Sequence, residues 1–282
     1  MTQRETNMDK RGALFGRWKM REGTWMLTNR WLNMMYLLEG EEMAALIDTG
    51  YGEGNIRQYV ESVTDKPVIV ICTHGHMDHT GGNGWWPWVY MALEGARASK
   101  EFLNKEQELW WKHMPYQDYE IIPVKDGDQI DLGGRILEIL TIPAHHESSI
   151  AILDQKERLL FTGDELESGQ VLYFVRDMNL PYQETAKAHL NNMEKIYARR
   201  KEYDALCPAH NGAMLDPDTY ILDFMELDRQ LIAGTAKLLP DEGGFGWGPD
   251  SHDGSNPFFD KYGVLRRAEY GQASVVYEES LK

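Results

Sequence analysis

The stretch CTHGHMDHTGG, residues 72–82, decides the fold class and the chemistry of this chain. It follows VIVI, an apolar and β-branched run that predicts a buried strand. In α/β proteins the loop that leaves a strand end commonly carries the chemistry. Four residues in this loop could bind a metal, and they fall within six positions: His74, His76, Asp78 and His79.

The spacing of these side chains favours a metal site over the usual interpretation of a lone histidine as a surface or core residue. His74 and His76 are two residues apart, so in an extended segment they face the same way. Asp78 and His79 can then turn toward a second point, so one loop could serve two metals. Imidazole and carboxylate ligands suit Zn, and also Fe or Mn.

Composition limits the function. The chain has 282 residues and a net charge of −16, from 29 basic and 45 acidic residues. This balance argues against binding nucleic acid or an anionic membrane, so we expect a small-molecule substrate. The two cysteines favour a reducing compartment. Because the N-terminal segment lacks an apolar signal core, and no apolar run could span a bilayer, we expect a cytoplasmic protein.

Three further strands deliver polar residues at their ends. RILEILTI, an alternating run, ends at His145 and His146, LLFTG ends at Asp164, and DALCP precedes His210. Asp48 closes another strand. We expect it to support the ligand loop by hydrogen bonds rather than to bind metal.

The rest of the chain is organised around these strands. Residues 1–24 are charged and expected to be peripheral, and helices are expected over 184–200 and from 216 to about 239. We expect residues 1–239 to form one domain. Residues 240–282 form an extension whose 241–262 part has the Gly-rich, aromatic composition of a loop. The extension packs either on this domain or on a partner subunit, as in a homodimer.

Taken together, these motifs resemble the metallo-β-lactamase superfamily, including its glyoxalase II and lactonase relatives. The resemblance covers roughly residues 25–215 through LIDTG, THGHMDHTGG, DGDQIDLGG, IPAHHESS, FTGD and PAHNG. It implies an α/β fold, a four-layer αβ/βα sandwich. It also implies one metal held by His74, His76 and His145, a second held by Asp78, His79 and His210, and Asp164 as the bridge. PAHHESS departs from the family's usual PGHTPGS, which leaves the choice between His145 and His146 to be tested.

The resemblance implies two divalent cations, with Zn expected and Fe or Mn as alternatives. A metal-bridging hydroxide would attack the substrate, and Asp78 would act in catalysis by orienting the water and moving its proton. We expect hydrolysis of a small ester, lactone or thioester. The alternatives are a persulfide-dioxygenase-like oxidoreductase with a single iron, a phosphodiesterase, and a metal-bearing binding protein without turnover.

Four residues are candidates for substrate binding: His146, Tyr173, Trp85 and Trp247. Trp85 lies just downstream of the ligand loop and would line an apolar pocket, or fill the core. Tyr173 is the tyrosine nearest to Asp164 on its C-terminal side. Trp247 belongs to the aromatic extension, which covers the metal cleft or packs on its own domain.

Overall fold

The computed structural model describes residues 5–6, 14–29, 32–52, 54–101, 117–239 and 264–279. The chain divides into two units, each made of two stretches. Unit 1 comprises Met1–Thr141 and Ser148–Phe161, and unit 2 comprises Ile142–Glu147 and Thr162–Lys282. Strand β12 (Leu159–Gly163) therefore begins in unit 1 and ends in unit 2.

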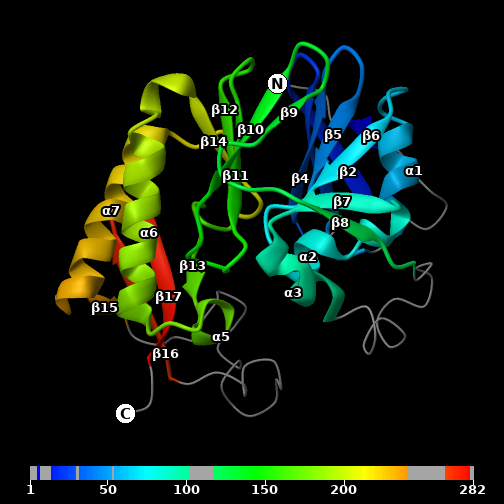
Figure 1. Ribbon diagram of the computed structural model, residues 1–282. Coiled ribbons are helices and arrows are strands. Elements are labelled where there is room, and N and C mark those ends of the chain that lie inside the picture. Colours follow the sequence, from blue (N-terminus) through cyan, green and yellow to red (C-terminus); the bar gives the residue numbers. More distant parts are fainter. Residues whose placement is uncertain are drawn as a thin grey trace. The chain divides into compact units, whose positions relative to one another are not determined.

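Unit 1 contains an eight-stranded sheet whose strands follow one another in chain order (Figure 1). Neighbours from β1 to β5 run antiparallel, and neighbours from β5 to β8 run parallel. The parallel step from β5 to β6 needs a crossover, which helix α1 (Ile56–Glu61) provides. The strands are β1 (Glu5–Thr6), β2 (Phe15–Arg21), β3 (Thr24–Asn29), β4 (Met34–Glu39), β5 (Ala44–Ile47), β6 (Val68–Ile71), β7 (Trp88–Met91) and β8 (Glu120–Pro123).

The buried side chains of this sheet explain where the ligand loop starts. Strand β6 is VIVI, and its last three residues are buried, which fits a parallel strand covered on both faces. Leu46, Val70 and Cys72 belong to one apolar core together with Ile56 of α1. This packing fixes the end of β6. Short helices follow it along the chain: α2 (Met77–Thr80), η1 (Asn83–Trp85), η2 (Leu93–Gly95) and α3 (Ala96–Glu101).

The remaining strands of unit 1 are antiparallel neighbours: β9 (Gln129–Asp131), β10 (Ile136–Thr141), β11 (Ile150–Asp154) and the start of β12. Arg135 ties them to the larger sheet. Its buried guanidinium pairs with Asp154, which is also fully buried, and donates to the carbonyl oxygens of Gly23 and Glu39. Burying this charge is tolerable because each of its nitrogens has an acceptor.

Unit 2 contains a four-stranded sheet in the order β13-β17-β16-β15, with helices α6 and α7 packed against it (Figure 1). β14 (Ala205–Pro208) lies beside the end of β12, where the Ala209 amide donates to the Gly163 carbonyl. The other elements are β13 (Val171–Tyr173), α5 (Val175–Met178), α6 (Tyr182–Tyr197), η4 (Arg200–Glu202), α7 (Pro217–Ala233), β15 (Leu238–Leu239), β16 (Val264–Tyr270) and β17 (Ala273–Glu279).

The structure places a strand within the N-terminal segment that was expected to be peripheral. β2 pairs along most of its length with β3, with one irregularity between Lys19 and Arg21, and most of its residues are partly exposed. Its charges alternate with other side chains: Arg17, Lys19 and Arg21 are separated by Trp18 and Met20. Alternation of this kind is the pattern of a strand with one solvated face.

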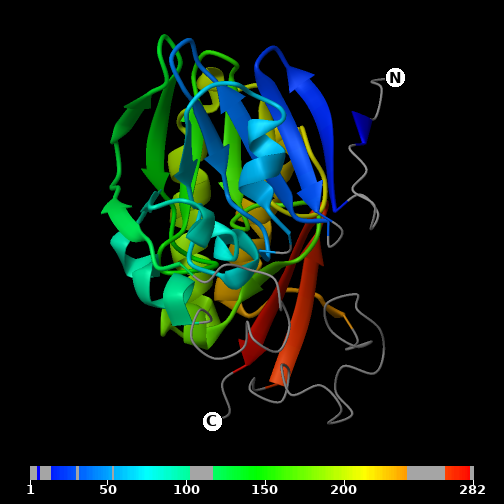
Figure 2. The same cartoon turned by 90° about the vertical axis from the view of Figure 1, so that its right-hand side faces the viewer.

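The C-terminal part also differs from expectation. α7 ends at Ala233 because Gly234 adopts a left-handed conformation with φ of 68°, a common helix stop. In the last described range, 264–279, β16 and β17 form a hairpin with its turn at Gly271, which Figure 2 shows as two long arrows. These strands fall within the expected 240–282 extension and pair into the unit 2 sheet. The aromatic stretch 241–262 lies outside the described residues.

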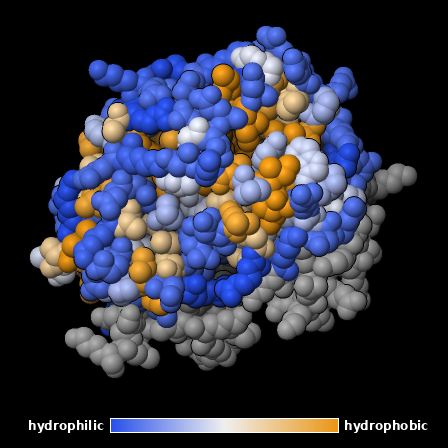
Figure 3. All heavy atoms as spheres, in the orientation of Figure 1, coloured by the Kyte–Doolittle hydropathy of each residue, from blue (hydrophilic) through white to orange (hydrophobic). Residues whose placement is uncertain are grey.

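One face of the molecule is mainly hydrophilic. Hydrophilic residues cover much of the face shown in Figure 3, with smaller apolar patches between them. Among the helices that the structure describes, none combines the length and apolar character needed to cross a bilayer.

Candidate metal centre

The ligand loop of unit 1 is a tight turn between β6 and α2. His76 caps the N-terminus of α2, and Asp78 and His79 lie within that helix. The turn depends on glycine, since a Cβ at Gly75 would lie 2.8 Å from the carbonyl oxygen of Gly95. This close approach leaves no room for a side chain, so the sequence HGH is needed for the loop to fold as it does.

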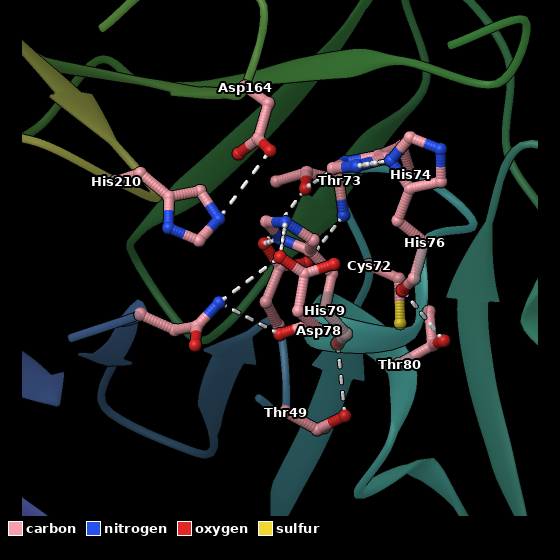
Figure 4. Close-up of polar contacts among 12 residues, drawn as sticks. Thr49, Cys72, Thr73, His74, His76, Asp78, His79, Thr80, Asp164 and His210 are labelled. Atoms are coloured by element: carbon pink, nitrogen blue, oxygen red, sulfur yellow. Dashed lines mark hydrogen bonds and ion pairs between the residues drawn. The ribbon is translucent and has the colours of Figure 1, made fainter. Parts of the chain in front are cut away.

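The loop brings its ligand atoms into pairs (Figure 4). His74 Nε2 lies 3.0 Å from His76 Nδ1, and His79 Nε2 lies 3.4 Å from Asp78 Oδ2. Each pair offers nitrogen or oxygen atoms within 4.8 Å of one another, the spacing of ligands to a single ion. The two pairs match the sequence prediction of two ligand directions from one loop.

Asp48 holds this loop by hydrogen bonds, as predicted from the sequence. Its carboxylate accepts from the Thr73 backbone amide at 2.7 Å, from the Thr73 hydroxyl at 2.8 Å and from His79 Nδ1 at 2.8 Å. Asp48 itself adopts a left-handed backbone conformation with φ of 59°, which only a few residue types tolerate. The prediction that Asp48 supports the ligands by hydrogen bonds is confirmed.

The hydrogen bonds also fix which histidine nitrogen can bind a metal. The Thr73 hydroxyl gives its single hydrogen to Asp48, so its oxygen accepts from His74 Nδ1 at 3.1 Å. His79 Nδ1 likewise donates to Asp48. Both rings therefore carry their proton on Nδ1 and present the lone pair of Nε2. This arrangement is typical of metal-binding histidines.

Unit 2 contributes a second set of ligand atoms. His210 Nε2 lies 3.5 Å from Asp164 Oδ2, the contact drawn in Figure 4, and His145 Nε2 lies 3.7 Å from the same oxygen. His145 Nδ1 donates to the Leu172 carbonyl at 3.1 Å, which again leaves Nε2 as the ligand atom. One carboxylate oxygen thus faces two imidazoles, as a bridging ligand would. This geometry favours His145 over His146 as the ligand.

The donor set fits a divalent metal. It consists of imidazole nitrogens and carboxylate oxygens, which suit Zn, Fe and Mn, and the three rings with defined Nδ1 partners present Nε2. Cys72 does not join this set. Burial, followed by the nearby Asp48 charge, raises the pKa of its thiol well above the usual range, and the sulfur instead exchanges hydrogen bonds with Asn83.

The candidate substrate residues have other contacts in the structure. Tyr173 is 1 % exposed and donates its hydroxyl to Asp228, and Trp85 packs against the apolar core of unit 1. His146 is 4 % exposed. Trp247 lies outside the described residues. A substrate role for these four residues stays a prediction.

Sequence reasoning missed several residues around the ligands. Asn33 donates to the backbone and the carboxylate of Asp78, at 3.2 and 3.4 Å. Glu165 accepts from the backbone of the His145 turn. A signal existed for one further residue, Asp228, because it lies between Leu227 and Leu231 on the buried face of α7, where a carboxylate needs a partner.

Comparison with known proteins agrees with this geometry. The family model "Metallo-beta-lactamase superfamily" matches residues 29–210, more than half of the chain. The chain belongs to the metallo-β-lactamase superfamily. Membership in this superfamily confirms the predicted family and its α/β sandwich fold, and it supports a hydrolase.

Two curated relatives are similar over part of their length. The acyl-coenzyme A thioesterase MBLAC2 of Homo sapiens is 26 % identical over 166 residues, which cover 49 % of this chain and 60 % of the relative. A hydroxyacylglutathione hydrolase of Francisella philomiragia is 28 % identical over 166 residues, covering 58 % of this chain and 60 % of the relative. The match thus spans about three-fifths of each relative.

A solved structure of another activity shares the fold. Rubredoxin oxygen:oxidoreductase of Desulfovibrio gigas superposes with a TM-score of 0.54 and 17 % identity, over 76 % of this chain and 62 % of that one. At this identity the likeness concerns the fold alone. The same superfamily fold therefore carries hydrolases and an oxidoreductase, and the chemistry has to be argued from the ligands.

Proposed function

We propose that this chain is a dinuclear metal-dependent hydrolase of small esters, lactones or thioesters. The observation that carries the proposal is the ligand geometry within each unit: the unit 1 loop offers two pairs of ligand atoms, and in unit 2 one oxygen of Asp164 faces His145 and His210. In the proposal, His74, His76 and His145 would hold one cation, and Asp78, His79 and His210 would hold a second. Asp164 would be a ligand to both.

The residues of the chain then have distinct roles. Divalent cations, when bound, lower the pKa of water and polarise a carbonyl oxygen. Asp78 orients the attacking water and carries its proton toward the leaving group. Asn33 holds Asp78 in place through its side-chain amide. Neither cysteine is needed as a nucleophile, and both are buried.

Among the three substrate classes, thioesters are the first to test. The two relatives are named for cleaving acyl-coenzyme A and hydroxyacylglutathione, and in both names the acyl group is joined to a thiol compound.

The test combines metal analysis with a substrate panel. Protein purified without chelator should contain close to two metal ions per chain. It should hydrolyse at least one of acyl-coenzyme A thioesters, acylglutathiones, acyl-homoserine lactones and p-nitrophenyl esters, but not bis-p-nitrophenyl phosphate. An Asp78→Asn variant serves as the control for background hydrolysis. A single tightly held iron, with no second ion under metal excess, would instead support the oxidoreductase alternative.

A further inference from the structure

A buried carboxylate holds the turn that carries His145. Glu165 is 1 % exposed, and its Oε1 accepts from the backbone amides of Ala144 and His145, both at 2.7 Å. Glu165 also directly follows Asp164 in the chain. One residue is therefore covalently joined to one candidate ligand and hydrogen-bonded to the backbone of another.

The main chain of Glu165 is held from the opposite side. Its carbonyl accepts from His189 Nε2 at 2.7 Å, and His189 Nδ1 donates to Asp228 Oδ2 at 2.7 Å. Tyr173 donates to the other oxygen of Asp228 at 2.8 Å. His189 comes from α6, Asp228 from α7 and Tyr173 from β13, so residues of three unit 2 elements form one chain of hydrogen bonds that ends at the Glu165 carbonyl.

These contacts close a circuit around His145. Its ring donates to the carbonyl of Leu172, the neighbour of Tyr173, and its backbone amide donates to Glu165. The partners of His189 are a carboxylate and a carbonyl, which only accept hydrogen bonds, so both ring nitrogens carry a proton. His189 is therefore an imidazolium paired with Asp228, and a buried charge pair with every site satisfied is rigid.

We propose that Glu165, held by His189, is the positioning residue that sets the spacing of His145 and Asp164. This inference rests on the proposed function, because it assigns both side chains to the metal site. The turn AHHES lacks the glycine and proline of PGHTPGS, and the two bonds from Glu165 supply the local order that such residues would give. Losing this support weakens metal binding without removing any ligand.

Three substitutions of Glu165 separate the effect of side-chain length from that of charge. Glu165→Gln keeps the length of the side chain and an acceptor oxygen, so the two amides stay bonded. Glu165→Asp keeps the charge but is one methylene shorter, and Glu165→Ala removes both. If positioning is the role, Gln should retain metal affinity within about threefold. Asp and Ala should lose about 10–100-fold, the usual cost of removing a group that orients a metal ligand.

The measurement is the dissociation constant of each Zn²⁺ ion, determined by chelator competition on variants shown to be folded by circular dichroism. Ile221→Ala is the matched control, since Ile221 is fully buried in α7 and has no part in the circuit. It should lower the melting temperature while leaving Zn²⁺ affinity within about twofold. His189→Gln should weaken Zn²⁺ binding in the same direction as Glu165→Ala, which keeps the test available if the alanine variant does not fold.

The outcomes separate this inference from the proposed function. Affinity that ranks Asp above Gln, or a folded Glu165→Ala with the affinity of the Ile221→Ala control, overturns the positioning role. Wild-type protein that binds two Zn²⁺ ions but hydrolyses none of the panel overturns the proposed function alone. Wild-type protein that binds no metal overturns both.

Discussion

At the scale of single residues, the candidate ligands differ from other histidines in how their rings are held. His74, His79 and His145 each direct Nδ1 to an acceptor, which leaves Nε2 for a metal. His189 is different, because both of its nitrogens are hydrogen-bonded to acceptors inside unit 2. The number of histidines in the sequence cannot distinguish a metal ligand from a structural histidine. The hydrogen-bond partners of the two ring nitrogens can.

The neighbouring histidines 145 and 146 give the first prediction. His145→Ala should lose one metal ion per chain and most activity, because it removes the Nε2 that lies beside Asp164. His146→Ala should keep the metal content of the wild type. Elemental analysis of both purified variants decides, and equal metal loss in the two would show that the ligand is misassigned.

Asp164 gives the second prediction. Its Oδ2 lies 3.5 Å from His210 Nε2 and 3.7 Å from His145 Nε2, so a bridging role predicts more than the loss of one ligand. A bridging carboxylate reduces the repulsion between two cations. Asp164→Ala should lose the ion on Asp78, His79 and His210 first, and turnover should fall by orders of magnitude.

Asp164→Asn separates charge from shape. The amide keeps an oxygen in place but cannot offset the charge of the cations. Asp164→Asn should therefore lose less metal affinity than Asp164→Ala, while its turnover rate should still be far below that of the wild type. Metal titration of variants with wild-type circular dichroism is the measurement. A folded Asp164→Ala that binds two ions with near wild-type activity would contradict the dinuclear mechanism.

At the scale of elements, helices α6 and α7 share one buried ion pair, between His189 and Asp228. Burial alone would lower the pKa of His189, but the charge and hydrogen bond of Asp228, together with Glu165, raise this pKa from 6.5 to about 9. The groups that face His189 are Asp228, Glu165 and Tyr173. The helices therefore pack around a histidine that is charged at neutral pH.

The third prediction concerns the pH dependence of this packing. Because the pKa of His189 is higher in the folded than in the unfolded chain, the stabilisation is fully present below about pH 6.5. It is lost as the pH rises toward and through about 9. Urea unfolding at pH 6.5, 8 and 9.5 should show a falling free energy of unfolding. The double variant His189→Gln with Asp228→Asn should lose much of this slope, and an unchanged slope would refute the assignment.

At the scale of the whole molecule, the sequence predicts best where local pattern and burial agree. VIVI before the histidine loop and the support from Asp48 are examples, since each depends on neighbours in the chain or on the shared end of parallel strands. The helix predicted from 216 to about 239 ends earlier, at Ala233, because the left-handed Gly234 stops it before Pro240 is reached.

Contacts between residues that lie far apart in the chain could not be predicted from the sequence. His189 and Asp228 are 39 residues apart on two helices, and each alone reads as a polar residue on an apolar face. The β16–β17 hairpin was missed because Arg266, Arg267 and Glu269 conceal its alternation, although Gly271 marks the turn. Tertiary pairing determines both features, and no local propensity encodes it.

The last prediction follows from the ligands taken together. Asp78 and Asp164 are two of the 45 acidic residues behind the net charge of −16, and bound cations would offset the charge of these two carboxylates. A ligand that binds only the folded chain stabilises it by mass action, by about 2.7 kcal/mol at a concentration one hundred times its dissociation constant. Chelation should therefore lower the melting temperature by several degrees. Zn²⁺ should restore it and Mg²⁺ should not, because imidazole ligands suit zinc. Asp164→Ala is the matched control and should show a smaller drop on chelation. A wild-type melting temperature that stays unchanged after elemental analysis confirms complete metal removal would show that the metals do not stabilise the folded chain.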